Sequence, residues 1–527
     1  MNDTPVFSHA AVVAPHWLAA QAGRDILVQG GNAIEAMVAM AATIAVVYPH
    51  MNALGGDGFW LMREPNGNVR AIEACGFAGE KATLERYRLA EVDAIPSRGP
   101  EAALTVPGSL GGWALALELS GAIGGRLPLN ILLENATRHA LGGYPVSASE
   151  MRFDPTKHGD LMAAPGFAAT YLTGGKPAKA GDIRKVTQLG ETLGQLAHAG
   201  LDDFYRGDVA REIAGDLERI GSPVTRADLK AYRAHWRPPL SLHIHGATLY
   251  NTPPPTQGLA SLILMGLFER LRIRNVESFA YFHGLIEATK RALSIRDSVV
   301  TDFNQLEHDC ADFLTPDALD RETSRIDMNR AVSWPLKSDS GDTVWMGAID
   351  AEGRAVSFIQ SIYWEFGSGC VLPRTGVLMQ NRGVSFSLDL GAVNSLQPGR
   401  RPFHTLNPPL AVFDDGRLMS YGVMGGDGQP QFQAQLLTRY LAGQNLSQAL
   451  DAPRFLFGRS WGEPSTSVKL EDGFDDGIGR ALAHAGHEIE WKPRGDSFGH
   501  AGALVRNANG AIEAAHDPRS DGGAEGL

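Results

Sequence analysis

The most constraining feature of the sequence is a change of pattern near residue 343. Between residues 108 and 293, apolar side chains recur mostly at helical spacing, which predicts a helical layer. After the small, polar and turn-prone stretch 333–342, the runs become rich in β-branched and aromatic residues separated by short turns. We therefore expect a helical layer and antiparallel hairpins, joined by an exposed connection.

Several sequence signals indicate where helices lie, begin and end in the first part of the chain. The clearest helical segments are residues 114–119, 131–141 and 279–293. Ahead of them, Asn32 is a suitable cap and Glu35 a favourable first-turn residue for a helix that ends before Pro49. Residues 37–48 are Ala-rich and too few to span a bilayer, so this helix should be buried in the core. The run Pro253-Pro254-Pro255 predicts a rigid polyproline II connector.

Two predicted hairpins follow the exposed connection. They pair residues 343–349 with 355–363, and residues 409–413 with 419–423. A third predicted hairpin lies earlier in the chain, around the turn at Pro65-Asn66-Gly67. If Ile349 pairs with Ala355, the same register places Thr343 opposite Ser361. Two hydroxyl groups would then meet at the start of a strand. Such pairs are common in ordinary sheets, so this one gains meaning only from its context.

Charge and cysteine content narrow the class of protein. The chain has 527 residues, 44% of them hydrophobic, and a formal net charge of −12 without a basic cluster. This composition favours a small-molecule enzyme and argues against nucleic acid or a membrane as partner. The start of the sequence has no signal-peptide pattern. Cys75, Cys310 and Cys370 are too few and too scattered for a disulfide framework, which fits a reducing cytoplasm.

Other reactive side chains do not form recognisable sites. His283 and His500 have no neighbours at metal-ligand spacing, so we expect structural or solvent-facing roles and no metal. Cys370 has no histidine placed near it by any motif and is more typical of a small buried thiol.

Six ordered motifs in the chain resemble those of the γ-glutamyltransferases, a family of N-terminal-nucleophile hydrolases. They lie at residues 30–33, 49–58, 106–109, 253–258, 422–427 and 517–522. The resemblance covers most of the chain. It implies a four-layered α/β/β/α sandwich, in which two stacked antiparallel sheets lie between helical layers.

The resemblance also implies self-processing. The family precursor cuts itself before a threonine, which here matches Thr343, preceded by Asp342. Residues 1–342 would form a large subunit and residues 343–527 a small one, as a heterodimer sharing one catalytic domain; a dimer of heterodimers is left open. Chemically, a threonine hydroxyl needs an adjacent base, and a freed α-amine with a pKa near ~8 can act as that base.

Three further residues match catalytic positions of the family. Ser361 matches the residue whose hydroxyl hydrogen-bonds the nucleophile, in agreement with the hairpin register. Gly425 and Gly426 match the pair whose backbone amides face the developing oxyanion, and removing one such donor typically slows a reaction roughly 100- to 1000-fold. The alternative for Gly425-Gly426 is a plain turn.

The chain departs from the family pattern where glutamate is recognised. Cys75 stands at the position of the arginine that binds the α-carboxylate, and Ser385 at that of the aspartate that binds the α-amine. His404-Thr405 replaces a serine pair, and Tyr363 replaces an asparagine. A glutamyl group would leave two charges unpaired here, at a cost of several kcal/mol. The sequence is therefore not that of an ordinary γ-glutamyltransferase.

One cation is gained, because Arg382 stands where the family usually has a glutamine close to the substrate. An arginine fork suits a carboxylate. The alternatives are a surface arginine or a pair with Asp389, and Arg98 is a second candidate for the carboxylate. Tyr363 beside the pocket would reduce its size, which favours a small acid amide.

These departures resemble the branch of the family that hydrolyses oxamate to oxalate and ammonia in purine (allantoin) nitrogen catabolism, without metal or organic cofactor. The residues alone indicate an amidase for a small anionic amide. Two alternatives remain: a γ-glutamyl hydrolase or transferase for glutathione-like substrates, and an uncleaved relative with a structural or binding role.

Overall fold

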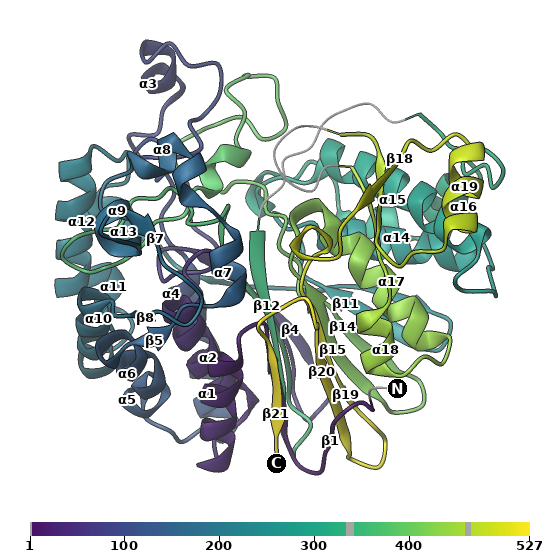
Figure 1. Ribbon diagram of the computed structural model, residues 1–527, viewed down its shortest axis with the longest axis horizontal. Helices are drawn as coiled ribbons and strands as arrows, with labels where there is room; N and C mark the ends of the chain where they lie inside the picture. Colours follow the sequence, from purple (N-terminus) through teal and green to yellow (C-terminus); the bar gives the residue numbers. More distant parts are fainter. Residues whose placement is uncertain (1–2, 334–341, 459–464) are drawn as a thin grey trace.

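The chain is arranged in four layers, with two stacked sheets between two sets of helices (Figure 1). The computed structural model describes residues 3–333, 342–458 and 465–527. Three buried apolar clusters occupy the three interfaces: helices against the first sheet, sheet against sheet, and the second sheet against helices. The α/β/β/α sandwich expected from the sequence is confirmed.

The first sheet contains the predicted nucleophile. Its strands, in order across the sheet, are β21 (Gly523–Gly526), β2 (Ala11–Ala14), β12 (Asp342–Ile349), β13 (Ala355–Tyr363), β3 (Asp57–Arg63), β4 (Val69–Ala74) and β9 (His235–Arg237). All neighbouring strands are antiparallel. The predicted hairpins are confirmed, both for β12 with β13 and for β3 with β4.

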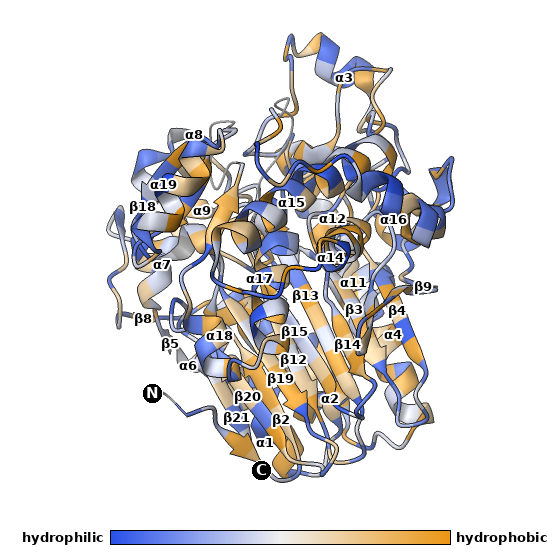
Figure 2. Ribbon diagram, turned by 90° about the vertical axis from the view of Figure 1, so that its right-hand side faces the viewer, coloured by the Kyte–Doolittle hydropathy of each residue, from blue (hydrophilic) through white to orange (hydrophobic). Residues whose placement is uncertain are grey.

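The second sheet packs on the inner face of the first. Its strands, in order, are β1 (Val6–Phe7), β20 (Ile512–His516), β19 (Ala501–Arg506), β15 (Leu418–Val423), β14 (Leu410–Phe413), β11 (Ala247–Asn251) and β10 (Leu240–Ile244). Apolar residues run along both sheets (Figure 2). The hairpin of β14 and β15 is as predicted. Strands β9, β10 and β11 are not, because they interrupt the region expected to be helical.

The helices of the first outer layer cover the first sheet. They are α1 (Trp17–Val28), α2 (Ala33–Val47), α4 (Ser109–Ala122), α5 (Leu129–Leu132), α6 (Glu134–Gly142), α10 (Thr187–Ala199), α11 (Asp203–Arg206), α12 (Asp208–Ile220) and α13 (Arg226–Ala231). Helices α2 and α4 contact the strands directly. The single helix expected at 131–141 is divided at Leu133 into α5 and α6.

Helix α2 begins with the expected cap. The Asn32 side chain accepts hydrogen bonds from the backbone amides of Ile34 and Glu35, and the Glu35 carboxylate accepts one from the Asn32 amide. The helix ends at Val47, before Pro49, and all its residues are buried. Its cap and its burial are therefore as predicted.

The second outer layer covers the other sheet, and shorter elements surround the core. The layer comprises α14 (Gly258–Arg270), α15 (Phe279–Val299), α16 (Pro316–Thr323), α17 (Gln429–Leu441), α18 (Leu446–Asp451) and α19 (Asp476–His484). The shorter helices are α3 (Leu84–Leu89), α7 (Ala148–Arg152), α8 (Gly159–Met162) and α9 (Phe167–Tyr171). One small sheet contains β16 (Phe455–Phe457), β17 (Val468–Glu471) and β18 (Ile489–Lys492). Two further strand pairs are β5 (Tyr144–Pro145) with β8 (Ile183–Arg184), and β6 (Leu172–Thr173) with β7 (Lys176–Pro177).

Two expectations about connections have different outcomes. The Pro254–Pro255 peptide bond is cis and lies in a turn, so the polyproline II prediction was wrong. Most of the connection predicted at 333–342 lies outside the described residues.

Within the described ranges, no helix is long and apolar enough to cross a membrane.

A tryptophan between the sheets fixes the strand that carries the predicted nucleophile. Trp345 of β12 is buried, and its indole Nε1 donates a hydrogen bond of 2.9 Å to Ser357 Oγ of β13. A side chain at Gly422 of β15 would lie 2.2 Å from the indole, and one at Gly502 of β19 would lie 2.6 Å from it. Glycine is therefore required at both positions for the sheets to close around Trp345.

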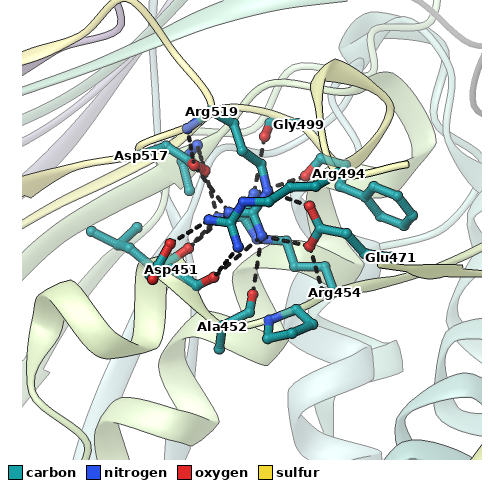
Figure 3. Close-up of polar contacts among 12 residues, drawn as sticks. Asp451, Ala452, Arg454, Glu471, Arg494, Gly499, Asp517 and Arg519 are labelled. Carbon is teal, nitrogen blue, oxygen red and sulfur yellow. Dashed lines mark hydrogen bonds and ion pairs between the residues drawn. The ribbon is translucent and has the colours of Figure 1, made fainter. Parts of the chain in front are cut away.

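A buried ion-pair network holds the segment that follows the small three-stranded sheet (Figure 3). Arg454 forms an ion pair of 2.5 Å with Asp517 and donates hydrogen bonds to the carbonyl oxygens of Phe498 and Gly499. Arg519 pairs with the other oxygen of Asp517. Burial alone would raise the pKa of Asp517, but the two guanidinium groups hold it well below its usual range. The terminal motif 517–522 thus supports the chain around Gly499.

We predict that Arg454→Met destabilises the protein by about 3–5 kcal/mol, because it leaves the Asp517 carboxylate buried beside a single cation. Arg494→Met is the matched control: Arg494 pairs with Asp451 at the surface, where such a pair contributes about 0–1 kcal/mol. Urea denaturation followed by tryptophan fluorescence measures both. Equal losses in the two variants would contradict the importance of the buried network.

Candidate active site

The β12–β13 pairing brings the two expected hydroxyl groups together. From Ile349 opposite Ala355 to Val344 opposite Gln360, the register is the predicted one. Between Asp342 and Val344 the register shifts, so Thr343 lies at an irregularity rather than in a regular pair. Thr343 Oγ1 nevertheless donates a hydrogen bond of 3.4 Å to Ser361 Oγ, and both residues are buried.

Two further contacts involve the paired hydroxyl groups, one at Ser361 and one at Thr343. Ser361 Oγ accepts a hydrogen bond of 2.8 Å from the backbone amide of Tyr363, which directs the serine toward the strand end. Gln429 Nε2 lies 3.5 Å from Thr343 Oγ1. Gln429 is the first residue of α17, so this contact comes from the N-terminal turn of that helix. Sequence reasoning did not identify Gln429.

The Gly425-Gly426 turn connects β15 to α17. The φ angles are +121° at Gly425 and +52° at Gly426, both in the region that favours glycine. The turn continues through a short 3₁₀ helix, Gly426–Gly428, into α17. Backbone amides at such a helix start suit a developing negative charge. The glycines thus directly precede the helix whose first residue, Gln429, contacts Thr343, and their role as oxyanion donors stays a prediction.

Gln257, at the end of the proline-rich motif, links two walls of the site. Its side-chain amide donates hydrogen bonds to the carbonyl oxygens of Thr405 and Gly426. Its own oxygen accepts a hydrogen bond of 2.7 Å from Arg296, which also pairs with Asp427 at 2.5 Å. The motif therefore fixes the glycine turn and the 404–405 segment relative to each other.

Arg382 is a buried cation beside the strand end. It is 1% exposed, and its guanidinium carbon lies 3.8 Å from the centre of the Tyr363 ring. The backbone of Tyr363 has a φ of +81°, which is rare for a side chain of this size. The alternative of a surface arginine is therefore wrong, and Asp389 is itself exposed.

His404 and Asp57 face each other on the same side of the site. His404 Nε2 lies 3.6 Å from Asp57 Oδ2. Burial, and then the Arg382 charge, hold the pKa of His404 well below its usual range, so its ring is neutral. Neither ring nitrogen, nor the Thr405 hydroxyl, makes a hydrogen bond within the described residues. Most buried polar atoms in proteins have a hydrogen-bond partner, so these three atoms have the capacity to bind a polar group.

Cys75 and Ser385 stand where the family has the two charged residues that bind glutamate, and neither side chain carries a charge. Cys75 is buried, and burial together with Glu73 raises the pKa of its thiol well above the usual range. Ser385 Oγ is buried and makes no hydrogen bond in the described structure. Their side chains can bind neither a carboxylate nor an ammonium group as an ion pair.

Arg98 has a different environment from Arg382. Its guanidinium donates hydrogen bonds to the carbonyl oxygens of Glu365 and Gly367 and lies over the Trp364 ring. These contacts hold the turn that follows β13. Which of the two arginines binds a carboxylate stays a prediction.

A second polar cluster lies away from Thr343, on α15. His283 and His487 share a hydrogen bond of 2.8 Å, and both lie near Glu287, so the expectation that His283 has no partners was wrong. Lys290 pairs with Glu287 at 2.7 Å and already supplies a positive charge there. Burial and Lys290 lower the pKa of His487 to about 3. The cluster is thus a hydrogen-bonded network that needs no metal for its charge balance.

Comparisons with known proteins agree with this geometry. The family model described as gamma-glutamyltranspeptidase matches residues 19–527. The chain is 49% identical, over the full length of both proteins, to the oxamate amidohydrolase proenzyme of Klebsiella pneumoniae subsp. pneumoniae. It is 38% identical, again over both full lengths, to a glutathione hydrolase-like proenzyme of Bacillus subtilis.

A solved structure supports the fold assignment. The cephalosporin acylase from Bacillus halodurans superimposes with a TM-score of 0.92 at 30% identity, covering 100% of this chain and 97% of the acylase. Acylases and amidohydrolases both cleave carbon–nitrogen bonds of amides. The chain belongs to the γ-glutamyltranspeptidase family and is an amide-hydrolysing enzyme of the N-terminal-nucleophile class.

Proposed function

We propose that the chain is a self-processing amidohydrolase that converts oxamate to oxalate and ammonia. Processing at the Asp342–Thr343 bond would give a large subunit of residues 1–342 and a small subunit of residues 343–527. The two subunits would remain together as a heterodimer. We also extend to this chain the role in purine nitrogen catabolism that the sequence resemblance implies.

The observation that carries the proposal is the charge pattern around Thr343. Arg382 supplies a buried cation, while Cys75 and Ser385 leave the glutamate-reading positions uncharged. Oxamate matches this pattern because it has one carboxylate, no ammonium group and an adjacent amide carbonyl. The 49% identity to an oxamate amidohydrolase proenzyme supports the same substrate.

All catalytic groups of the proposed reaction belong to the chain, and water is the second reactant. The freed α-amine of Thr343 accepts the hydroxyl proton while Oγ1 attacks the amide carbon. The resulting oxyanion faces the amides of Gly425 and Gly426, and Arg382 holds the substrate carboxylate. The carbon–nitrogen bond then breaks, and ammonia leaves with the proton returned by the amine. Water, deprotonated by the same amine, hydrolyses the ester and releases oxalate.

A γ-glutamyl hydrolase or transferase is the second candidate. The Bacillus subtilis relative is called glutathione hydrolase-like, and a glutathione hydrolase proenzyme of Escherichia coli is 28% identical to this chain. Against this candidate, a glutamyl group would place both an ammonium and a carboxylate beside Cys75 and Ser385. Leaving them unpaired is unfavourable in a buried pocket.

We predict self-cleavage between Asp342 and Thr343. The active protein should show chains of 342 and 185 residues on a denaturing gel (527 − 342 = 185), with Thr343 as the first residue of the shorter chain. Thr343→Ala should remain one inactive chain, because it lacks the attacking hydroxyl. Thr343→Ser keeps the hydroxyl and is the control that should still cleave. An intact but active wild-type chain, or a different cut site, would refute the proposal.

We predict that kcat/KM for oxamate exceeds that for glutathione at least ~100-fold, because leaving two charges unpaired should cost at least ~2.7 kcal/mol. Ammonia release measures oxamate turnover, and glutamate release measures glutathione turnover. Comparable rates, or a preference for glutathione, would show that Cys75 and Ser385 were misread as lost contacts.

We predict that Arg382→Gln still self-cleaves but loses about 2–4 kcal/mol of transition-state binding for oxamate, the typical cost of removing one partner of a desolvated ion pair. Arg98→Gln is the comparison variant and should change oxamate kcat/KM far less. The reverse order of effects would assign the carboxylate to Arg98.

A further inference from the structure

The Gln429 side chain lies between the predicted nucleophile and a series of buried amide groups. Gln429 is 0% exposed, and its Nε2 lies 3.5 Å from Thr343 Oγ1, the acceptor that the described part of the chain gives to this nitrogen. Its Oε1 accepts a hydrogen bond of 3.4 Å from Asn407 Nδ2. An amide nitrogen only donates and an amide oxygen only accepts, so the orientation of Gln429 decides what it can do to the Thr343 hydroxyl.

The amide of Asn407 is oriented from two sides. Its Nδ2 also donates to the backbone carbonyl oxygen of Thr405 at 3.4 Å, and a carbonyl oxygen can only accept. Its Oδ1 accepts a hydrogen bond of 3.3 Å from Asn251 Nδ2. Asn251 is oriented in turn, because its own oxygen accepts a hydrogen bond of 2.9 Å from the backbone amide of Thr252. Asn407 therefore presents its NH₂ group to Gln429.

This network makes Gln429 a donor to the Thr343 hydroxyl. Because the Gln429 oxygen is occupied by Asn407, its NH₂ group is the end that faces Thr343 Oγ1. The Thr343 proton then points to the other side, where Oγ1 donates to Ser361 Oγ at 3.4 Å. Both contacts are long, as catalytic hydrogen bonds often are before a substrate is bound. These four residues are at most 1% exposed, so bulk water does not compete for their polar groups.

We propose that Gln429 is a positioning residue for the nucleophile, which donates a hydrogen bond to Thr343 Oγ1 and keeps the hydroxyl proton directed away from α17. The inference rests on the proposed function. During attack, the donated bond holds Oγ1 in place while the freed α-amine accepts its proton. During hydrolysis of the ester, the same NH₂ group stabilises the negative charge that develops on Oγ1 as it leaves. Gln429 gives up no proton and forms no covalent bond in either step.

The first test replaces the amide with a thioether in Gln429→Met, which keeps the length of the side chain. Displacing a reacting group by about 1 Å can slow a reaction about 100-fold. We therefore expect kcat for oxamate, measured by ammonia release, to fall about 10- to 100-fold. KM should change less than about twofold, because Gln429 acts through Thr343 and not on the substrate. Self-cleavage of the purified precursor should also slow, because the same hydroxyl attacks.

Gln435→Met is the matched control. Gln435 lies on the same helix and is equally buried, but its side-chain amide bonds to backbone groups of Gln431 and Phe455. A general loosening of α17 would affect both variants, whereas the loss of a donor to Thr343 affects Gln429→Met alone. Equal losses of kcat in the two variants would refute the positioning role.

Gln429→Glu provides a readout that a merely structural role would not change. An ionised glutamate can only accept hydrogen bonds, whereas a protonated one can accept from Asn407 and donate to Thr343. Burial favours the protonated form, so the donor returns as the pH is lowered from about 8 to about 6. We expect the ratio of variant to wild-type kcat to rise over this range, while the ratio for Gln429→Met stays constant. Both ratios cancel the titration of the Thr343 amine.

Each outcome has a defined meaning. If the wild type hydrolyses oxamate but Gln429→Met keeps its kcat, or Gln429→Glu is as impaired as Gln429→Met at every pH, the role of Gln429 is refuted and the proposed function stands. A Gln429→Glu variant with wild-type kcat at every pH supports the role, because its carboxyl group is then protonated throughout. If Gln429→Met does not fold, the pH series of Gln429→Glu decides.

A failure of the proposed function gives a different result. If the wild type cleaves itself but releases no ammonia from oxamate, the proposed substrate is wrong, and the self-cleavage rates of the same variants decide the role of Gln429. If the wild type does neither, Thr343 is not a nucleophile and both proposals are refuted.

Discussion

The site depends above all on the antiparallel pairing of β13 with its two neighbours. On one side β12 brings the Thr343 hydroxyl to Ser361, and on the other side β3 places Asp57 opposite the same serine. Trp345, enclosed between the sheets two residues after Thr343, prevents β12 from sliding along its partner. The packing of the whole sandwich therefore fixes the position of the predicted nucleophile.

Sequence reasoning succeeded where the determining contacts are local. The β12–β13 register follows from a short turn and an apolar pattern, and the start of α2 follows from a cap that Asn32 and Glu35 form within one helical turn. Strands β10 and β11 also had a local signal, since Leu240-Ser-Leu-His-Ile alternates and a glycine turn follows. That alternation was overlooked because the surrounding segments are helical.

The residues that sequence reasoning missed are those whose partners are distant in the chain. Asp57 bonds to amides 19 and 51 positions away, Gln429 reaches a threonine 86 positions away, and Arg454 pairs with an aspartate 63 positions away. No spacing rule connects such residues. The family resemblance supplied Thr343, Ser361 and the two glycines. Asp57 lies within the motif at residues 49–58, but the resemblance assigned it no role, and Gln429 and Arg454 lie outside the six motifs.

The irregularity at the start of β12 joins the fold to the proposed chemistry. In a regular ladder, the peptide groups of a strand are held by hydrogen bonds to the partner strand. The register of β12 shifts between Asp342 and Val344, at the peptide bond proposed to break, while the ladder from Val344 onward is regular. Such irregularities release backbone groups from pairing and redirect a side chain. In the proposed reaction, this irregularity would let Thr343 attack its own preceding carbonyl and later a substrate, while the remainder of β12 stays in place.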